Sequence, residues 1–443
     1  MAIAIAFAGL SVAAPPVQAA GTYYVSTRGS NTAPGTRSSP WRTLQKAANS
    51  APAGSTIYIR GGTYAGAKIT RSGLTFANVS GEVAYVAGDA GHTNVIWISS
   101  ARDVVIRGLK VKNAPAKWGA GIRIDASSRI RIDSVVAFNN KSFGILVNDS
   151  TGVTITRSEI RGNETGIQFS RAGSGSRITD NRIHHNNRMI VNDSTAYNDR
   201  GANAVVFYRT TGTITASKNR IWGHRALSTD YGYDGGAFEV YSASNVVMSG
   251  NVLYNNQNAL ETGSDGTLGC SNIRYTRNIT YGGVDGGLPS EGLILRCASN
   301  SLVANNTFYD LSRFVFYING GGAFAGGIEN LRIRNNLSRQ TGDKIYSLDG
   351  AIPTSVTIDH DLVWNKAGAS IAWKSGVGNT ASLSTFRSWT GYDLHGVQAD
   401  PKLDVATWRS RLPSPVVDRG TGISGVTTGF LGRAPDIGRY ELR

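Results

Sequence analysis

One short pattern of apolar and polar positions repeats along the middle of the chain, from about residue 96 to 365. Each copy has an apolar strand, a turn residue, a second apolar strand and a third strand that usually begins with Gly. The turn residues recur at intervals of 23 to 38 residues, mostly in the twenties, and they are Gly108, Ser134, Ser158, Asn181, Asn219, Asn251, Asn278, Asn306 and Asn336. Such a period, with Asn or Gly stacked at one turn, is typical of a parallel β-solenoid, whose units cannot bury their apolar faces singly. The pattern therefore predicts an all-β solenoid of at least nine coils.

The turn residues are expected to join neighbouring coils. Asn tolerates the left-handed backbone conformation, and its amide can bond to the same side chain one coil above and below. In the third strand alternate residues point into the core, so those between them form a column on the outer face, with about 4.8 Å between neighbouring coils. A long polymer could lie along this column, which includes Gln168 in the strand that begins at Gly166.

Two different ends flank the coils. Residues 40–49 have helical spacing and predict an amphipathic helix that caps the first coil, where unpaired strand edges would otherwise be exposed. The tail from about Ser382 has no regular pattern and is expected to form an irregular C-terminal cap. We therefore expect one domain, with an N-terminal cap and first coils over 21–95, central coils over 96–365 and a C-terminal cap over 366–443.

The first twenty residues are an apolar run that ends in Val17-Gln18-Ala19, the small-residue pattern that a signal peptidase cuts. We predict a signal peptide over residues 1–20 and a secreted protein, with a buried helix as the alternative. No later stretch reaches the ~18 uninterrupted apolar residues that would span a bilayer. A membrane protein is therefore not expected.

The two cysteines hold equivalent places one coil apart. Cys270 begins the segment CSNIRYTRN, and Cys297 begins CASNSLVANN. Stacked neighbours fall inside the ~4.4–6.8 Å Cα separation of a disulfide, and a secreted protein permits oxidation. We predict a Cys270–Cys297 disulfide, with two free thiols as the alternative.

Composition and charge narrow the function. The 443 residues include 54 Gly, and 40% are hydrophobic and 17% charged, which disfavours both disorder and a mostly helical enzyme. The 45 Lys and Arg exceed the 30 Asp and Glu, so a net charge of +15 favours anionic partners such as nucleic acid, acidic glycan or anionic lipid. Nucleic acid is disfavoured because the basic residues are spread singly through the coils, without aromatic-basic modules or a helix for a groove. We expect a monomer that binds an acidic polysaccharide.

The two longest intervals, 38 and 32 residues, mark insertions in consecutive coils. A solenoid places such insertions as loops that wall a binding surface. The first insertion contains Asp199, and the second contains Tyr233 and Asp234. Both are rich in acids, aromatic rings and polar groups, so we expect them to line a substrate site.

Two glutamates follow the second insertion. Glu239 lies in GGAFEVY, and Glu261 lies one coil later in QNALETG. Phe238 and Leu260 take inward positions, which places both carboxylates side by side on the outer column. Like charges stacked so closely cannot both ionise without a cation or a shared proton, which suggests a functional site. A structural carboxylate pair screened by a nearby Arg is the alternative.

The chain opens with YYVSTRGSN, SPWRTLQKA and AGSTIYIRGGTY and closes with LPSPVVDRGT and APDIGRYE. These segments resemble the ends of secreted right-handed parallel β-helix proteins that act on carbohydrate, including polysaccharide lyases of the pectate lyase, alginate lyase and chondroitinase B kinds. With the coils, the likeness covers almost the whole mature chain. It implies a right-handed parallel β-helix with an N-terminal helical cap, a fold shared by lyases, glycoside hydrolases and epimerases.

Two chemistries use such a carboxylate pair. Calcium takes carboxylate and amide oxygens, so Asp234, Glu239 and Glu261, with Asp199, could hold an ion that neutralises a uronate carboxylate for a lyase. Alternatively, carboxyl groups ~5–5.5 Å apart suit the acid and nucleophile of a retaining glycosidase without a metal.

For elimination, we place Asp234, Glu239, Glu261 and Arg296 in the catalytic set. Arg296 and Arg209 bracket the glutamates and could bind uronate carboxylates through their planar guanidinium groups. Tyr208 could supply or accept a proton.

The resemblance to chondroitinase B and the alginate lyases centres on GAFEVYSASN, where those enzymes carry an acidic calcium ligand, then a catalytic Lys, with an Arg one coil on. Glu239 matches the ligand-type acid. Residues 240–244 contain no Lys, and Glu261 stands where the Arg would be expected. The family's acid and base are therefore not transferred.

The histidines carry weaker signals. His184 and His185 are expected to form a turn pair rather than a metal site, and His360 and His395 are expected at the surface. Our leading hypothesis is a secreted polysaccharide lyase that cleaves a uronate-containing polymer by β-elimination. The alternatives are a β-helix glycoside hydrolase that uses Glu239 and Glu261, and a non-catalytic glycan-binding surface protein.

Overall fold

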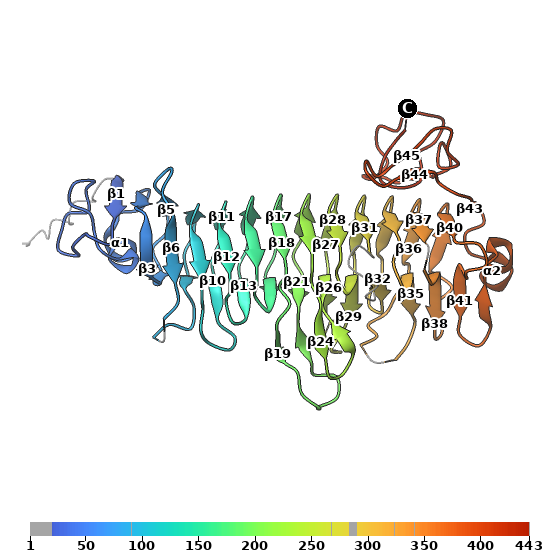
Figure 1. The fold of residues 1–443 in the computed structure, drawn as a ribbon, viewed down its shortest axis with the longest axis horizontal. Coiled ribbons are helices and arrows are strands. Elements are labelled where there is room, and N and C mark those ends of the chain that lie inside the picture. The colour runs from blue at the N-terminus through green and yellow to red at the C-terminus, as the bar shows by residue number, and fades with distance from the viewer. Residues whose placement is uncertain are drawn as a thin grey trace, which may run out of the picture.

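The computed structural model describes residues 20–442 except 90, 267, 283–289, 323 and 341. Three 13-stranded sheets wind around one long axis, and each coil gives one strand to each sheet in turn (Figure 1). Neighbouring strands run parallel except β41 and β42, which close the third sheet as an antiparallel pair. The predicted parallel β-helix is confirmed. The expected signal peptide lies, apart from Ala20, outside the described residues.

The chain passes through sheet 1, sheet 2 and sheet 3 in each coil. Sheet 1 consists of β1 (Thr22–Val25), β2 (Thr56–Ile59), β5 (Thr75–Asn78), β8 (Val105–Arg107), β11 (Arg131–Asp133), β14 (Thr154–Thr156), β17 (Ser176–Thr179), β22 (Ile214–Ser217), β27 (Val246–Ser249), β30 (Arg274–Thr276), β33 (Leu302–Ala304), β36 (Arg332–Arg334) and β39 (Thr357–Asp359). Sheet 2 consists of β3 (Gly62–Ala65), β6 (Ala84–Ala87), β9 (Lys110–Lys112), β12 (Val136–Phe138), β15 (Glu159–Arg161), β18 (Arg182–His184), β23 (Arg220–Trp222), β28 (Val252–Tyr254), β31 (Ile279–Tyr281), β34 (Thr307–Tyr309), β37 (Leu337–Gln340), β40 (Leu362–Asn365) and β43 (Val397–Gln398).

Sheet 3 carries the site described below. It consists of β4 (Ala67–Ile69), β7 (Ile96–Ser99), β10 (Ala120–Asp125), β13 (Phe143–Asn148), β16 (Thr165–Ser170), β21 (Asn203–Tyr208), β26 (Gly236–Tyr241), β29 (Asn258–Gly263), β32 (Glu291–Leu295), β35 (Phe314–Asn319), β38 (Lys344–Asp349), β41 (Ala372–Lys374) and β42 (Gly378–Thr380). The remaining elements are the hairpins β19 (Met189–Val191) with β20 (Arg200–Gly201), β24 (Ala226–Ser228) with β25 (Gly232–Asp234) and β44 (Leu403–Asp404) with β45 (Arg409–Ser410), and the helices α1 (Leu44–Ser50) and α2 (Leu383–Thr390).

Apolar side chains from all three sheets fill the interior of the coils. The inward positions of sheet 3 stack from coil to coil, and they are Ile122, Ile145, Ile167, Val205, Phe238, Leu260, Leu293 and Phe316. All of these side chains are fully buried. Because the side-chain period of a strand is two, fixing this inward row also fixes which residues face outward.

Asparagines stack at the turn between sheets 1 and 2, as expected. The Nδ2 of Asn219 donates to Oδ1 of Asn251 at 3.0 Å, and the same oxygen accepts the Asn219 backbone N–H at 2.9 Å. We expected each stacked asparagine to adopt the left-handed backbone conformation itself, and this was wrong. The residue before each asparagine adopts it instead, such as Lys218 with φ 57°. Gly108 and Ser134 occupy that left-handed position themselves, with φ 70° and 55°.

Each end of the solenoid is covered by a helix. The N-terminal helix α1 starts at Leu44 rather than near residue 40, because Thr43 is its N-cap and Trp41 instead pairs with Val25 as an isolated bridge. The C-terminal cap is not irregular throughout, since α2 begins after an N-cap at Ser382. Strands β41 and β43 also continue sheets 3 and 2 beyond residue 365.

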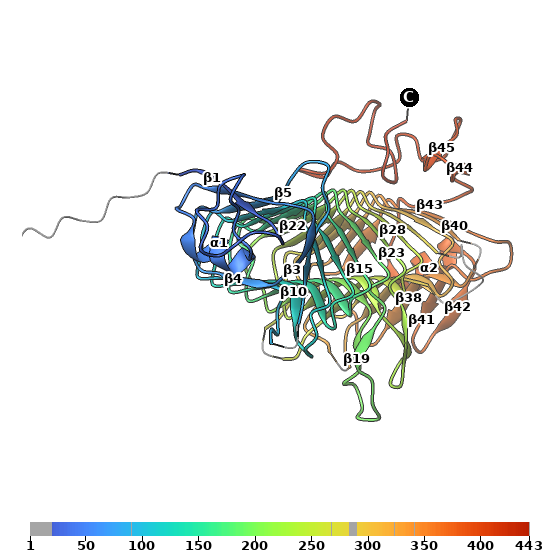
Figure 2. The same ribbon diagram turned by 60° about the vertical axis from the view of Figure 1, so that its left-hand side comes forward.

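The last residues fold back over the edge where sheets 1 and 2 meet. Asn305 Nδ2 donates to the carbonyl of Gly438 at 3.1 Å, and Asn335 Nδ2 donates to the carbonyl of Thr421 at 2.8 Å. The ring of Trp408 stacks on Tyr281 at 4.5 Å. This tail lies on the opposite side of the solenoid from the hairpins that carry β19 and β24 (Figures 1 and 2). Within the described residues, no helix is long and apolar enough to cross a membrane.

Candidate functional site

The two long insertions form antiparallel hairpins that stand beside sheet 3. The first carries β19 and β20, and the second carries β24 and β25. Asp199 ties them together, since its Oδ2 accepts from the Ser228 hydroxyl at 2.7 Å and from the Asp230 backbone N–H at 2.9 Å. Burial opposes ionisation of Asp199, but these hydrogen bonds outweigh it and hold its pKa below the usual range. Asp199 therefore acts as a structural link within the wall of the site.

Between this wall and sheet 3 lies a cleft of about 490 Å³. Eight of the nine residues predicted for catalysis or substrate binding line it, namely Gln168, Asp199, Tyr208, Tyr233, Asp234, Glu239, Glu261 and Arg296. The ninth, Arg209, follows β21 in a left-handed turn with φ 51° and pairs with Asp265 at 2.6 Å. Its guanidinium is held by this ion pair and is not part of the cleft lining.

Glu239 and Glu261 stand opposite each other on neighbouring strands. Glu239 in β26 is the register partner of Glu261 in β29, and the adjacent Phe238 and Leu260 are buried in the core. Adjacent strands are about 4.8 Å apart, so the two carboxylates leave the sheet side by side. The register expected from the repeat is the one in the structure.

The two carboxyl groups have different partners. Glu261 Oε1 accepts from Arg296 Nη1 at 2.8 Å. Glu239 Oε2 accepts from the neutral amide of Asn203 at 2.8 Å, and among the described residues Glu239 forms no ion pair. The Arg296 guanidinium favours the ionised form of Glu261, whereas an amide gives Glu239 much less compensation.

The pKa values of this pair follow from these environments. Burial, together with the charge of Glu261, raises the pKa of Glu239 from 4.5 to about 7. Burial also raises the pKa of Glu261, but Arg296 opposes the shift. Asp234 reaches the same cleft from β25, and burial and the charges of both glutamates raise its pKa well above the usual range. Burial therefore disfavours the ionised form of all three carboxyl groups, and Arg296 opposes this effect at Glu261.

Several lining residues were not predicted. Arg200 donates to Gln168 at 2.7 Å and pairs with the buried Glu164 at 3.4 Å. Glu291, at the start of β32, pairs with Arg313, whose side chain is 60% exposed. The position of Glu291, directly before Gly292 at the start of a third strand, weakly indicates that it lies near the site. Nothing in the sequence indicates that it pairs with Arg313.

Aromatic rings form part of the cleft lining. Tyr241 stacks on Tyr208 one coil earlier, with ring centroids 6.2 Å apart. Tyr197, from the first hairpin, meets Phe324 edge to face at 6.2 Å, so the hairpin reaches across to the loop after β35. Such rings provide flat apolar surfaces of the kind that pack against ligands.

Whether calcium fits the cleft depends on how closely its carboxylate oxygen atoms approach one another. Calcium takes six to eight oxygen ligands, so the predicted site needs the carboxylates of Asp234, Glu239 and Glu261 to converge. Among the described residues, the one set of three Asp, Glu, His or Cys side chains whose ligand atoms all lie within 4.8 Å of one another is elsewhere, at the C-terminal end of the solenoid. In the cleft, Arg296 already binds Glu261. These three carboxylates do not form a ready calcium site.

The fold and site define a class of protein: a parallel β-helix with a cleft built on one sheet, walled by insertions and lined by carboxylates, guanidinium groups and aromatic rings. Within that class, the chain belongs to the Pel9A-like, right-handed β-helix family, whose sequence model matches residues 23–272. A second model, for a right-handed β-helix region, matches residues 203–386. The right-handedness expected from the resemblance agrees with both.

Known relatives cover different shares of the chain. It is 25% identical over 429 residues to the uncharacterized protein YwoF of Bacillus subtilis strain 168. This alignment covers 85% of this chain and 87% of YwoF. It is 29% identical over 170 residues to pectate lyase PEL9 of Emericella nidulans, covering 36% of this chain and 38% of that enzyme. The solved structure of pectate lyase Pel9A matches with a TM-score of 0.56 at 17% identity, covering 97% of this chain and 98% of Pel9A. At that identity, the structural match shows a shared fold.

The predicted disulfide is confirmed. Cys270 and Cys297 are bonded across adjacent coils, with their Cα atoms 5.1 Å apart. The bond lies beside the last strands of the cleft, since Cys297 directly follows Arg296. It therefore links the coil of Glu261 to the coil of Arg296.

Proposed function

We propose that this protein is a secreted polysaccharide lyase that cleaves a uronate-containing acidic polysaccharide by β-elimination in the cleft on sheet 3. The observation that carries the proposal is Glu239, a carboxyl group in the cleft with an amide partner and a pKa of about 7. A general base is most effective when its pKa lies near the working pH. Membership of the Pel9A-like family and the similarity to pectate lyase PEL9 support elimination as the reaction.

Guanidinium groups are suited to bind the uronate carboxylate. Arg296 and Arg313 both line the cleft, and Arg313 has an exposed side chain that a substrate can reach. Planar guanidinium groups match carboxylates with two parallel hydrogen bonds. Binding the carboxylate in this way draws electron density from C5 and makes its proton easier to remove.

The reaction then needs one base and one acid. Ionised Glu239 takes the proton from C5, the electron pair forms the C4–C5 double bond, and the C4–O bond breaks. A tyrosine hydroxyl, from Tyr241 or its stacked neighbour Tyr208, donates a proton to the departing oxygen. Burial and nearby acids raise the pKa of Tyr241 to about 12, so its hydroxyl keeps its proton at neutral pH. The products are a new chain end with an unsaturated uronate and a chain with a free hydroxyl.

The charge balance of the cleft allows an anionic substrate. Five carboxyl groups line it, on Asp199, Asp234, Glu239, Glu261 and Glu291, and they face three guanidinium groups. A pKa of about 7 keeps part of Glu239 protonated near neutral pH, and burial raises the pKa of Asp234 as well. This reduces repulsion of a polyuronate, and every step of the mechanism as proposed uses side chains of the cleft.

A retaining glycoside hydrolase is the second candidate, and one observation favours it. Glu239, with a pKa of about 7, lies beside Glu261, whose ionised form Arg296 favours, and two such carboxyl groups could serve as acid and nucleophile. No lysine is found among the described residues that line the cleft, so neither reaction has a lysine base.

Incubation with a panel of acidic and neutral polysaccharides separates these candidates. An unsaturated, ultraviolet-absorbing product from a polyuronate, formed in the presence of a calcium chelator, is the expected result. New reducing ends without that absorbance would show that the protein is a hydrolase and not a lyase. Saturable binding of a glycan without cleavage would instead show that the protein binds glycan without catalysis. The disulfide and the family are consistent with secretion, and the presence of mature protein in culture medium tests it.

A further inference from the structure

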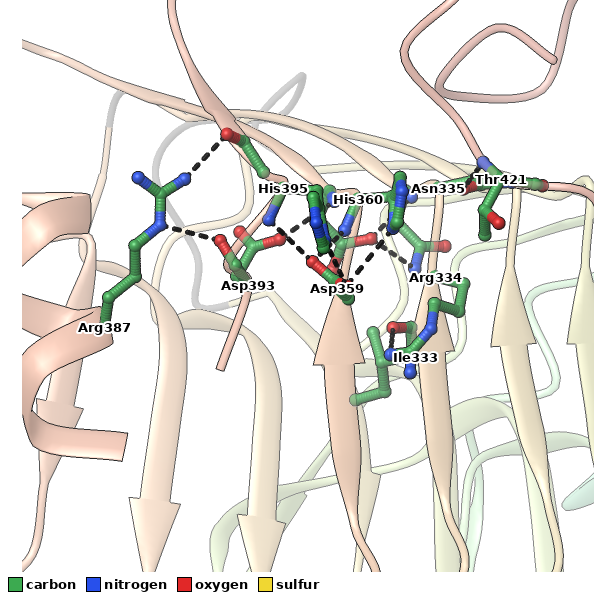
Figure 3. A network of polar contacts seen from close by, with 12 residues as sticks. Ile333, Arg334, Asn335, Asp359, His360, Arg387, Asp393, His395 and Thr421 are labelled. Carbon is green, nitrogen blue, oxygen red and sulfur yellow. Dashed lines mark hydrogen bonds and ion pairs between the residues drawn. The ribbon is translucent and has the colours of Figure 1, made fainter. Parts of the chain in front are cut away.

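Two histidines and one aspartate meet near the C-terminal end of the solenoid, away from the cleft. Asp359 ends β39, His360 occupies the following turn, and His395 lies between α2 and β43. Both imidazole rings lie beside the carboxylate of Asp359 (Figure 3). His395 Nδ1 lies 2.8 Å from Asp359 Oδ2, and His360 Nδ1 lies 3.3 Å from the same oxygen. One ligand atom from each side chain lies within 4.8 Å of the other two.

The contacts around these atoms leave a ligand position open. His360 Nδ1 is buried, and apart from its 3.3 Å approach to Asp359 Oδ2 it has no hydrogen-bond partner among the described residues, although a buried ring nitrogen normally has one. In a tetrahedral zinc site with bonds of about 2.0–2.1 Å, neighbouring ligand atoms lie roughly 3.3 Å apart. The separation of His360 Nδ1 from Asp359 Oδ2 matches that value. An ion in contact with both atoms would satisfy the unpartnered nitrogen.

We propose that Asp359, His360 and His395 bind one divalent transition-metal ion, with zinc as the reference ion, and that this ion fastens the C-terminal segment to the last coils. Imidazole nitrogens and a carboxylate oxygen are ligands that zinc prefers. The His395 side chain is 66% exposed, so an ion can reach the site from solvent, and water completes its coordination. Coordination through Nδ1 places the proton of the neutral His395 ring on Nε2, so the contact with Asp359 is replaced by bonds of both groups to the ion.

The three side chains are held in place by their surroundings. Asp359 Oδ1 accepts the backbone N–H groups of His360 and His395, at 3.0 and 2.8 Å, which leaves Oδ2 to face the rings. The loop that carries His395 is fixed by the buried Asp393, whose N–H donates to Ile358 and whose Oδ1 accepts the N–H of Asp361. Preorganised ligands lose little conformational freedom when an ion binds.

The position of His360 suggests what the ion does. His360 has φ 59° and continues the row of left-handed turn residues to which Asn305 and Asn335 belong. Those two asparagines bind the C-terminal tail through their side-chain amides. His360 makes the corresponding link by binding an ion together with His395. The site thus adds a further attachment between the coils and the residues that follow α2.

Zinc binding by the full chain, without a polyhistidine tag, tests the site. After removal of metal with EDTA and of the chelator by dialysis, zinc chloride is titrated by calorimetry, and melting is followed by circular dichroism. We expect one saturable site and a zinc-dependent rise in Tm. His395→Ala, at an exposed position, and His360→Ala should weaken the site at least about 10-fold and remove that rise. Cobalt bound in place of zinc should give a visible spectrum that both variants lose.

Two control variants separate this site from other histidines. His92 forms a pair with Asp89 at 2.7 Å but has no second histidine in that pair, so His92→Ala should leave zinc affinity unchanged. His185→Ala removes one member of the adjacent His184–His185 pair and should also have no effect. Equal zinc affinity in the wild type and His395→Ala would overturn the proposal. Loss of the site in His185→Ala but not in His395→Ala would overturn it as well.

Discussion

Glu239 predicts how the rate of cleavage depends on pH. If ionised Glu239 is the base and its pKa is about 7, it is about one-tenth ionised at pH 6 and about nine-tenths ionised at pH 8. The value of kcat/KM for a polyuronate should therefore rise about ten-fold between these pH values. Tyr241, one of the two tyrosines proposed as the acid, remains protonated over this range because burial and nearby acids raise its pKa to about 12. The measurement is the initial rate of absorbance increase in buffers of constant ionic strength.

A substitution beside Glu239 tests the cause of its pKa. The charge of Glu261 is the second contribution after burial, so Glu261→Gln should move the rising part of the profile to lower pH, besides lowering the rate. Glu291→Gln is the matched control, because it removes a carboxylate from the same cleft without removing a group that shifts the pKa of Glu239. A flat profile between pH 6 and 8 would refute Glu239 as the base. A rate that falls ten-fold over that range would show that its protonated form is the active one, as in a hydrolase.

Two further predictions concern stability. Burial raises the pKa of Asp361 from 3.8 to about 7, so the stability that its protonated form contributes is complete below about pH 4 and lost as the pH rises through 7. Asp361→Asn, which extends the asparagine stack, should therefore raise Tm at pH 8 but not at pH 4. An unchanged Tm at pH 8 would contradict this. Replacing both Cys270 and Cys297 by Ala opens a cross-link that spans 27 residues, and should lower the free energy of unfolding by about 3 kcal/mol in urea titrations; an undiminished midpoint would show that the coils alone fix this region.

The features of the fold and of the site that follow from the repeat could be predicted from the sequence. Aligning the apolar positions of successive coils fixed which residues face outward, and this brought Glu239 beside Glu261. The same alignment placed Cys270 beside Cys297, where the disulfide is found. In a solenoid each coil contacts mainly its neighbours, so a local sequence match is also a spatial contact.

Features outside the repeat could not be predicted in this way. Arg209 lies in the turn after β21, where its side chain pairs with Asp265 and does not line the cleft. Arg313 directly precedes β35 and pairs with Glu291 at the start of β32, but the apolar spacing does not indicate where its long side chain lies. The contact of His395 with the last coils depends on the path of a tail that carries no repeating pattern. These positions are set by long-range packing, for which the spacing of residues carries no signal.

The most direct test of the central claim compares the wild type with Glu239→Gln on a polyuronate that the wild type cleaves. Gln preserves the shape of the side chain and its contact with Asn203 but cannot accept a proton from C5. We predict that the variant folds and binds the polymer with similar affinity, while formation of unsaturated product falls at least about 100-fold. A variant that keeps most of the wild-type rate would contradict the assignment of Glu239 as the base.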